Sequence, residues 1–160
     1  HLFSSAASDV YKRQVELIGV EAGGPKGSNK HAAPLSNNSP LGVLHGARQY
    51  VIQDDQGEIE ETDSISAGLD YPGVSPLHCF LKETKRARYT SATDEEALEA
   101  FQLVSKNEGF VSPSLEPSHA FAEAIKIAPK LSKDTIIVVD SCGDSAKDSK
   151  IIAERLGYKI

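Results

Sequence analysis

A single acidic residue, Asp70, stands in the otherwise neutral run SISAGLDYPG at positions 64–73. Pro72 and Gly73 follow almost at once, so the carboxylate lies where the chain must turn. Two interpretations stay open from these residues alone. Asp70 is either a turn aspartate that caps backbone amides or a functional carboxylate in a site.

Two further stretches could build a site. Glu21 ends the apolar run VELIGV, and the following residues 22–42 are rich in Gly, Asn, Ser and Pro. A loop of that length is uncommon in a compact domain unless it is functional. The polar turn DSCGDSAKD at 140–148 follows the apolar run TIIVV, and ligands of α/β proteins collect beyond the carboxyl ends of parallel strands. A plain capped connection remains the alternative for this turn.

The elements that would position these residues alternate between strands and helices, which predicts an α/β architecture with a mainly parallel sheet. We predict strands at 15–20, 87–92 and 135–139, of which TIIVV is the clearest buried strand. We predict helices at 76–86, 94–108, 118–131 and 148–156, and a hairpin around 54–57. Thr93 and Glu96 have the spacing of a capping box, and Gly109 should end that helix. For helix 118–131 the predicted apolar face is Ala120, Ala124, Ile127 and Ala128. We expect the sheet to be incomplete.

Composition narrows the class of protein. The 160 residues carry a net charge of -6, and 39% are hydrophobic, as in a single acidic domain with a modest core. Nucleic-acid binding normally needs a basic face, which this composition does not supply. Cys79 and Cys142 lack the paired spacing of a zinc site or a disulfide framework, so we expect a reducing compartment. No apolar stretch approaches the roughly 20 residues that cross a bilayer, so we expect no membrane association.

Residues 1–14, HLFSSAASDVYKRQ, have no helical or strand period. They are similar to sequencing adaptor translated at the ends of metagenomic reads, so we predict that they are not native. The sequence also contains no methionine. We therefore expect a piece of a longer protein, with residues 15–160 as its native part.

From Val15 onward the chain resembles the C-terminal half of the tryptophan synthase β-chain family. The segments that carry the resemblance are VELIGVEAGG, HAAPL, HGARQYVIQDDQGEIEETDSISAGLDYPGV, TDEEALEAF, NEG, SLEPSHA and SCGDSAKD, in this order. The resemblance implies a fold-type II pyridoxal-phosphate lyase that replaces the hydroxyl of L-serine by indole to give L-tryptophan and water. The Schiff-base lysine and the phosphate loop of the family lie outside this chain, which alone should be inactive.

The resemblance also implies site residues. Asp70 matches an aspartate that contacts the serine-derived substrate, and Glu116 matches a glutamate near the cofactor ring. A helix-start carboxylate remains an alternative for Glu116. Cys142, followed by Gly143, stands where the family usually has a serine bonded to the pyridine nitrogen, and a thiol is the weaker donor. Residues 144–146, Asp-Ser-Ala, depart from the family's usual arginine, glycine and aspartate.

Further implied features concern ions and partners. Four residues match positions whose backbone carbonyls, or near neighbours, line a monovalent-cation site: Ala32, Leu69, Tyr71 and Gly73. Leu44 and His45 match the lining of an indole tunnel, with ordinary packing as the alternative for Leu44. The implied partners are an α subunit or fused α domain and a second β chain. The implied location is the cytoplasm, or a plastid in a eukaryotic alga.

The remaining polar residues carry weaker signals. We expect His31 and His119 to be hydrogen-bonded structural residues rather than catalysts, and His78 has no metal partner at ligand spacing. We interpret the basic cluster as a solvated face, with partner docking as the alternative; it comprises Lys82, Lys85, Arg86 and Arg88.

Two other classes of protein stay open. A fold-type II serine or threonine dehydratase would share the sheet but should lack the DYPGV run. A non-catalytic binding domain would bind no cofactor even within the longer protein.

Overall fold

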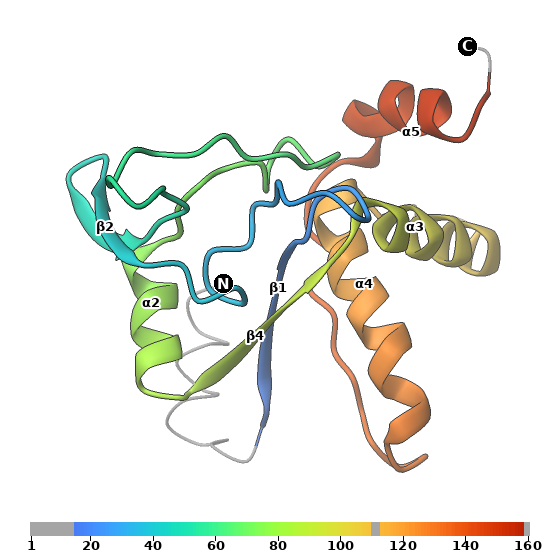
Figure 1. Ribbon diagram of the computed structural model, residues 1–160. Helices are drawn as coiled ribbons and strands as arrows, with labels where there is room; N and C mark the ends of the chain where they lie inside the picture. Colours follow the sequence, from blue (N-terminus) through green and yellow to red (C-terminus); the bar gives the residue numbers. More distant parts are fainter. Residues whose placement is uncertain (1–14, 110–112, 159–160) are drawn as a thin grey trace.

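The computed structural model describes residues 15–109 and 113–158, so the predicted non-native residues 1–14 lie outside it. Its centre is a parallel pair of strands, β1 (Leu17–Ala22) and β4 (Ala87–Ala92), shown in Figure 1. The predicted parallel α/β arrangement is confirmed, and β4 has the predicted bounds. Both strands are mostly half-buried, whereas β1 was expected to be buried on both faces.

Helix α3 (Asp94–Glu108) follows β4 directly, because its start is encoded locally. Thr93 Oγ1 accepts a hydrogen bond from Glu96 N, and the Glu96 carboxylate accepts one from Thr93 N at 2.9 Å. Gly109, at φ 71°, ends the helix. The predicted capping box and glycine stop are therefore confirmed.

Helix α4 (Leu115–Ile127) packs against α3 and ends in a 3₁₀ turn (Ala128–Lys130). It starts three residues before the predicted position, because Asp148 from the later turn caps it: Asp148 Oδ2 accepts from Leu115 N at 2.8 Å.

The predicted apolar face of α4 is wrong. Ala120, Ala124 and Ile127 are half-buried and Ala128 is exposed. Ser118 and His119 are buried instead. They can be, because each bonds a carbonyl one turn earlier: Ser118 Oγ that of Ser114, and His119 Nδ1 that of Leu115.

On the other side of the strands lie α2 (Pro76–Glu83) and an antiparallel hairpin, β2 (Leu41–Leu44) with β3 (Ala47–Tyr50), as Figure 1 shows. Helix α2 confirms the prediction but is three residues shorter. The β2–β3 hairpin was not predicted, and it turns through positive φ at His45 and Gly46. The hairpin predicted around residues 54–57 is reduced to a turn and one bridge, Gln53 with Ile59.

Residues 135–139, TIIVV, are not the buried strand that we predicted. They have no regular secondary structure, and Ile136 and Val138 are 86% and 88% exposed. A strand forms only when a neighbour takes its backbone hydrogen bonds, and within the described ranges none pairs with it. The segment leads to a short 3₁₀ turn (Ser145–Asp148) and helix α5 (Ser149–Arg155), close to the predicted helix 148–156.

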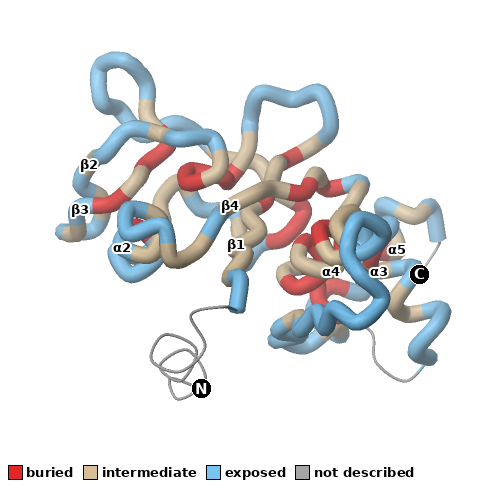
Figure 2. Tube along the Cα trace, turned by 90° about the horizontal axis from the view of Figure 1, so that it is seen from below, coloured by how far each residue is buried: buried red, intermediate tan, exposed pale blue. Residues whose placement is uncertain are grey.

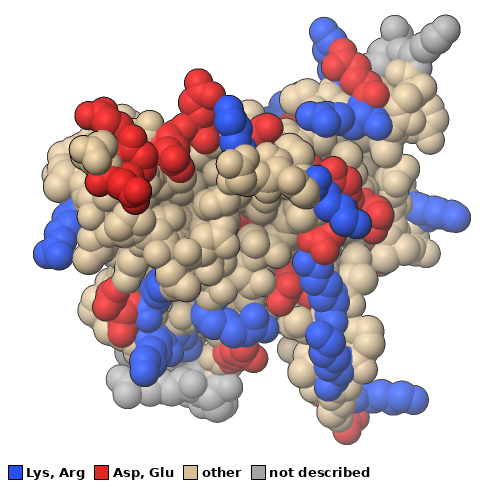
Figure 3. Space-filling model, viewed as in Figure 1, with Lys and Arg blue, Asp and Glu red and all other residues tan. Residues whose placement is uncertain are grey.

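Among the described residues, two small hydrophobic clusters pack around the helices. Ile65, Leu115 and Ile152 make one, and Ala92, Ala100 and Ala122 make the other. Figure 2 also shows buried segments beside β3 and α2. On the face in Figure 3, acidic side chains gather over the end of the molecule that carries β2.

Candidate active site

Glu116, in the first turn of α4, is the meeting point of two segments that are far apart in the sequence. Its carboxylate accepts hydrogen bonds from Lys147 Nζ, 2.9 Å from both oxygens. Its Oε1 also accepts from Gly68 N at 3.1 Å. Glu116 therefore links the turn that contains Asp70 to the turn after TIIVV.

The turn at 66–70 presents Asp70 to solvent. The amides of Leu69 and Asp70 both donate to the carbonyl of Ser66 at 3.0 Å, which fixes the backbone. Within the described part of the chain the Asp70 carboxylate accepts no hydrogen bond, so its interpretation as an amide cap is not supported. The side chain is exposed and available to a ligand.

Cys142 and Gly143 lie on the other side of Glu116. Ser114 Oγ donates to the carbonyl of Cys142 at 3.0 Å. Gly143 adopts φ 88°, and a Cβ at this position would lie 2.6 Å from Ser114 Oγ and 4.0 Å from Glu116 Oε2. Only glycine allows this approach without strain. The structure thus brings together Glu116, Cys142 and Gly143, the three residues predicted to meet the cofactor.

In this cluster one ammonium group faces two carboxylates. Burial raises the pKa of Glu116, but the hydrogen bonds from Lys147 and from its own backbone amide outweigh burial and lower the pKa to about 2. Lys147 Nζ also lies 2.7 Å from Asp148 Oδ1. Burial lowers the pKa of Lys147, but its bonds to Asp148 and Glu116 raise it overall. Two carboxylates thus share one ammonium group at the start of α4.

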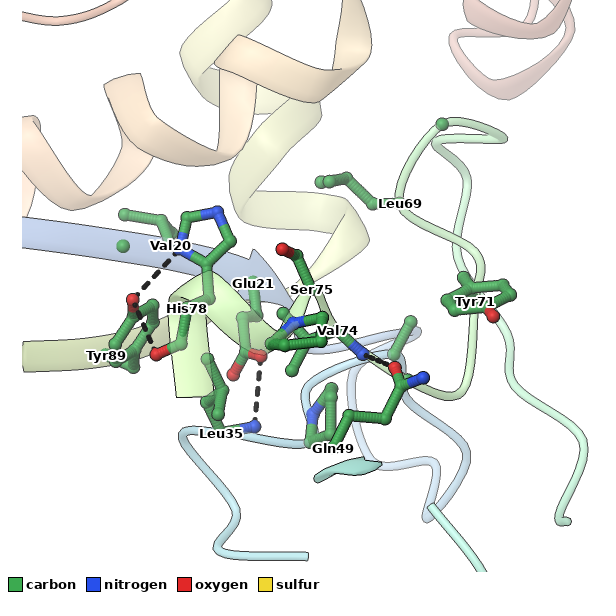
Figure 4. Close-up of a pocket in the computed structure, with 16 residues that line it drawn as sticks. Val20, Glu21, Leu35, Gln49, Leu69, Tyr71, Val74, Ser75, His78 and Tyr89 are labelled. Carbon is green, nitrogen blue, oxygen red and sulfur yellow. Dashed lines mark hydrogen bonds between the residues drawn. The ribbon is translucent and has the colours of Figure 1, made fainter. Parts of the chain in front are cut away.

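A second region, a cavity of about 530 Å³, lies between β1, α2 and the loop at 68–76. Figure 4 shows the labelled side chains that line it, among them Glu21 from the end of β1. The Glu21 carboxylate accepts from Leu35 N at 3.0 Å, from Ser36 N at 2.6 Å and from Ser36 Oγ at 2.8 Å. Burial is the largest influence and raises the pKa of Glu21 despite these bonds. The sequence indicated Glu21 only by its place at the strand end.

The cavity also contains a histidine–tyrosine pair that sequence reasoning missed. His78 Nδ1 and Tyr89 Oη are 2.9 Å apart, and Tyr89 Oη also donates to the carbonyl of His78 at 3.2 Å (Figure 4). Burial lowers the pKa of His78 and raises that of Tyr89 to about 12. Both groups are therefore neutral at pH 7. The pairing of α2 with β4 brings them together, and neither residue signals it alone.

The four residues matched to a cation site line this same cavity: Ala32, Leu69, Tyr71 and Gly73. The carbonyl of Leu69 already accepts from Tyr71 N at 2.8 Å. Tyr71 Oη is also 2.7 Å from Nδ1 of His45, at the tip of the β2–β3 hairpin. Leu44, beside His45, is half-buried and lies against Gly73.

The other predicted polar groups are structural. His119 is buried and bonds the carbonyl of Leu115 at 2.8 Å, while His31 Nδ1 accepts from Ala33 N at 3.1 Å. The solvated-face interpretation of the basic cluster fits Lys85 and Arg88, which are exposed, and Arg88 also pairs with Glu16 and Glu123. It is wrong for Lys82, which is half-buried because its ammonium group reaches the carbonyl of Leu35.

Residues 15–109 and 113–158 contain no group of three or more side chains placed to hold a metal ion. They also contain no helix long and apolar enough to span a membrane.

Comparison with known proteins gives a consistent result. No family model matches the chain. It is similar to proteins named tryptophan synthase beta chain: 56% identical over 148 residues in Ruegeria sp. (strain TM1040), 54% over 149 in Ruegeria pomeroyi and 51% over 147 in Chromobacterium violaceum. Each alignment covers 91% of this chain and 35–36% of the relative. The chain thus spans about a third of the length of these relatives, and the resemblance stated from its motifs is confirmed for that segment.

Proposed function

We propose that this chain is a segment of a pyridoxal-phosphate lyase that replaces the hydroxyl of L-serine by indole, giving L-tryptophan and water. The observation that carries the proposal is the convergence on Glu116 of the Asp70 turn and the Cys142–Gly143 turn. It occurs in a chain 51–56% identical to named tryptophan synthase beta chains.

The residues present fit the edge of a pyridine ring. Gly143 keeps the turn close to α4, and Cys142 supplies an exposed thiol that can meet the ring nitrogen. When bound, the cofactor supplies an electron sink for the substrate's α-carbon. Both Glu116 oxygens are already bonded to Lys147, so Glu116 anchors the site rather than moving a proton.

Asp70 is the group that we assign to the substrate. Its carboxylate is exposed and makes no hydrogen bond with the described residues, while its backbone is fixed. A carboxylate held in this way can accept hydrogen bonds from substrate or pair with a cationic side chain. Its role is to orient substrate and close the site.

The proposal includes a monovalent cation at the cavity of Figure 4. Backbone carbonyls suit hard cations, and Ala32, Leu69, Tyr71 and Gly73 all line this cavity. We also propose two partners, which are an α subunit or fused α domain and a second β chain. We propose that they meet in the cytoplasm.

The experiment is a full-length chimera in which residues 15–160 replace the aligned segment of one of the Ruegeria relatives. The chimera is given pyridoxal phosphate and L-serine, then indole, while its absorption spectrum and products are followed. A cofactor spectrum with tryptophan formation supports the proposal.

Two other results would contradict the proposal. Pyruvate and ammonia without tryptophan would indicate a dehydratase, and the absence of any cofactor spectrum would indicate a binding domain. The unmodified relative, treated in the same way, is the control.

A further inference from the structure

The turn at 142–148 departs from the family's pattern at residues 144–146, yet it has a well-defined structure here. Asp144 Oδ1 accepts from Ala146 N at 2.9 Å and caps the 3₁₀ turn. Ser149 Oγ donates to the carbonyl of Ala146 at 2.8 Å. These local bonds place Lys147 toward α4.

Lys147 arrives between two carboxylates. Its Nζ is 2.9 Å from both oxygens of Glu116 and 2.7 Å from Asp148 Oδ1. Asp148 is buried and its other oxygen caps α4 through Leu115 N. Since Asp148 is held by the helix, it holds Lys147 in turn, and the Glu116 side chain, only 18% exposed, is fixed with it.

Glu116 in turn holds the turn that contains Asp70. Its Oε1 accepts from Gly68 N, and a Cβ at position 68 would lie 2.5 Å from the same oxygen. The turn therefore sits directly on the carboxylate. A charged acceptor makes such a hydrogen bond roughly twice as strong as a neutral one.

We propose that Lys147 is a positioning residue, which acts through Glu116 to fix the Asp70 turn against the Cys142 turn. The consequence of this positioning for catalysis rests on the proposed function. The contacts that run from Asp148 through Lys147 and Glu116 to Gly68, here called the clamp, do not depend on that function. The hydrogen bond that Asp144 accepts from Ala146 N is what allows the altered residues 144–146 to keep Lys147 in place.

The first test measures the clamp without using activity. In the full-length chimera, hydrogen exchange of the peptide containing residues 66–70 is compared between the parent, Lys147→Met, Lys147→Arg and Lys150→Met. Lys147→Met should speed exchange of the Gly68 amide about tenfold, because its acceptor is no longer held. Lys147→Arg should largely restore protection, since a guanidinium can also bridge carboxylates.

Lys150→Met is the matched control, since Lys150 is an exposed lysine on α5 close to Lys147. It should exchange like the parent. Equal exchange in Lys147→Met and the parent would overturn the clamp, whether or not the chimera makes tryptophan.

The second test is the pH dependence of turnover. The titratable groups that face Glu116 are Lys147 and, through it, Asp148 from the turn, and His119 on α4 itself. Without the ammonium group, Glu116 takes up a proton at higher pH, so the acid limb of kcat in Lys147→Met should move up by about one pH unit. Lys147→Arg should keep the parent profile.

An unchanged acid limb and an unchanged kcat in Lys147→Met would overturn the positioning role. Absence of tryptophan synthesis in the parent chimera would instead contradict the proposed function, and the exchange measurement would still decide on the clamp.

Discussion

Glu116 and Glu21 are both half-buried glutamates whose carboxylates accept hydrogen bonds from backbone amides of a distant segment. Glu21 accepts hydrogen bonds from two amides and a hydroxyl of residues 35–36. Glu116 accepts from the amide of Gly68, from its own amide and from the ammonium group of Lys147. Their pKa values move in opposite directions. Burial raises the pKa of Glu21, while the bonds to Glu116 outweigh burial and lower its pKa to about 2.

The difference lies in the cation. Three neutral donors do not offset the burial of Glu21, and Lys82 is the smallest of the influences on it. A lysine in direct contact reverses the balance at Glu116. Glu21 is thus suited to fastening a loop, whereas Glu116 keeps a fixed negative charge beside the proposed substrate turn.

The largest expected effect is on turnover, and it tests whether catalysis depends on the region around Glu116. In the chimera, Asp70→Ala should lower turnover of L-serine with indole by about 100-fold, because substrate is no longer oriented. The cofactor absorption should be unchanged. Asp55→Ala, at an exposed aspartate of the 54–57 turn, is the control. If Asp70→Ala turned over substrate at the parent's rate, the assignment of catalysis to the turn beside Glu116 would be contradicted.

Next in size is the stability that Glu21 supplies. Glu21→Ala leaves the amides of Leu35 and Ser36 without their acceptor, so the free energy of unfolding should fall by about 2 kcal/mol. Denaturant titration of the chimera measures it, with Glu58→Ala at an exposed position as the control. A loss no larger than the control's would show that Glu21 does not fasten the loop.

Acid titration tests the opposite signs directly. The lowered pKa of Glu116 adds stability that is present above pH 4.5, its ordinary value, and is lost as the pH falls toward 2. The stability difference between the parent and Glu116→Gln should therefore shrink by about 1 kcal/mol over that range.

For Glu21 the raised pKa gives the reverse sign. Protonation on acidification toward pH 4.5 relieves the cost of burying the charge, so the parent should gain stability relative to Glu21→Gln in this window. The same sign of change for both pairs of proteins would contradict the comparison.

The smallest effect belongs to a bond without charge. Tyr89→Phe removes the hydroxyl that contacts His78, and the free energy of unfolding should fall by about 0.5 kcal/mol. Tyr158→Phe, at a 65% exposed tyrosine, is the control. A loss larger than that of Glu21→Ala would show that this pair, not Glu21, holds the cavity together.

Features that depend on neighbours along the chain could be predicted from the sequence. The Thr93–Glu96 capping box and the Gly109 stop needed only short-range bonds. Strand β4 was recognisable from its own residues, although its hydrogen bonds go to β1, far away in the sequence. The β2–β3 hairpin was missed because its turn uses His45 at positive φ, which few non-glycine residues adopt. The start of α4 was misplaced because its cap comes from Asp148, 33 residues away.

The candidate site likewise contains residues that the sequence indicated and contacts that it could not indicate. The resemblance supplied Asp70, Glu116, Cys142 and Gly143 one by one, and the structure brings the last three together. Lys147 had no stated role, because its contact with Glu116 spans 31 residues. The capping role of Glu21 likewise depends on where the loop at 35–36 folds back.

The unpaired segment TIIVV has a consequence for handling the chain by itself. It is an uncharged, β-branched run, and Ile136 and Val138 are almost fully exposed. Such a run offers free backbone donors and acceptors together with apolar side chains, which is the usual starting point for intermolecular β-pairing. Expressed without the rest of a longer protein, the chain should therefore self-associate as its concentration rises, and Val138→Lys should delay that aggregation.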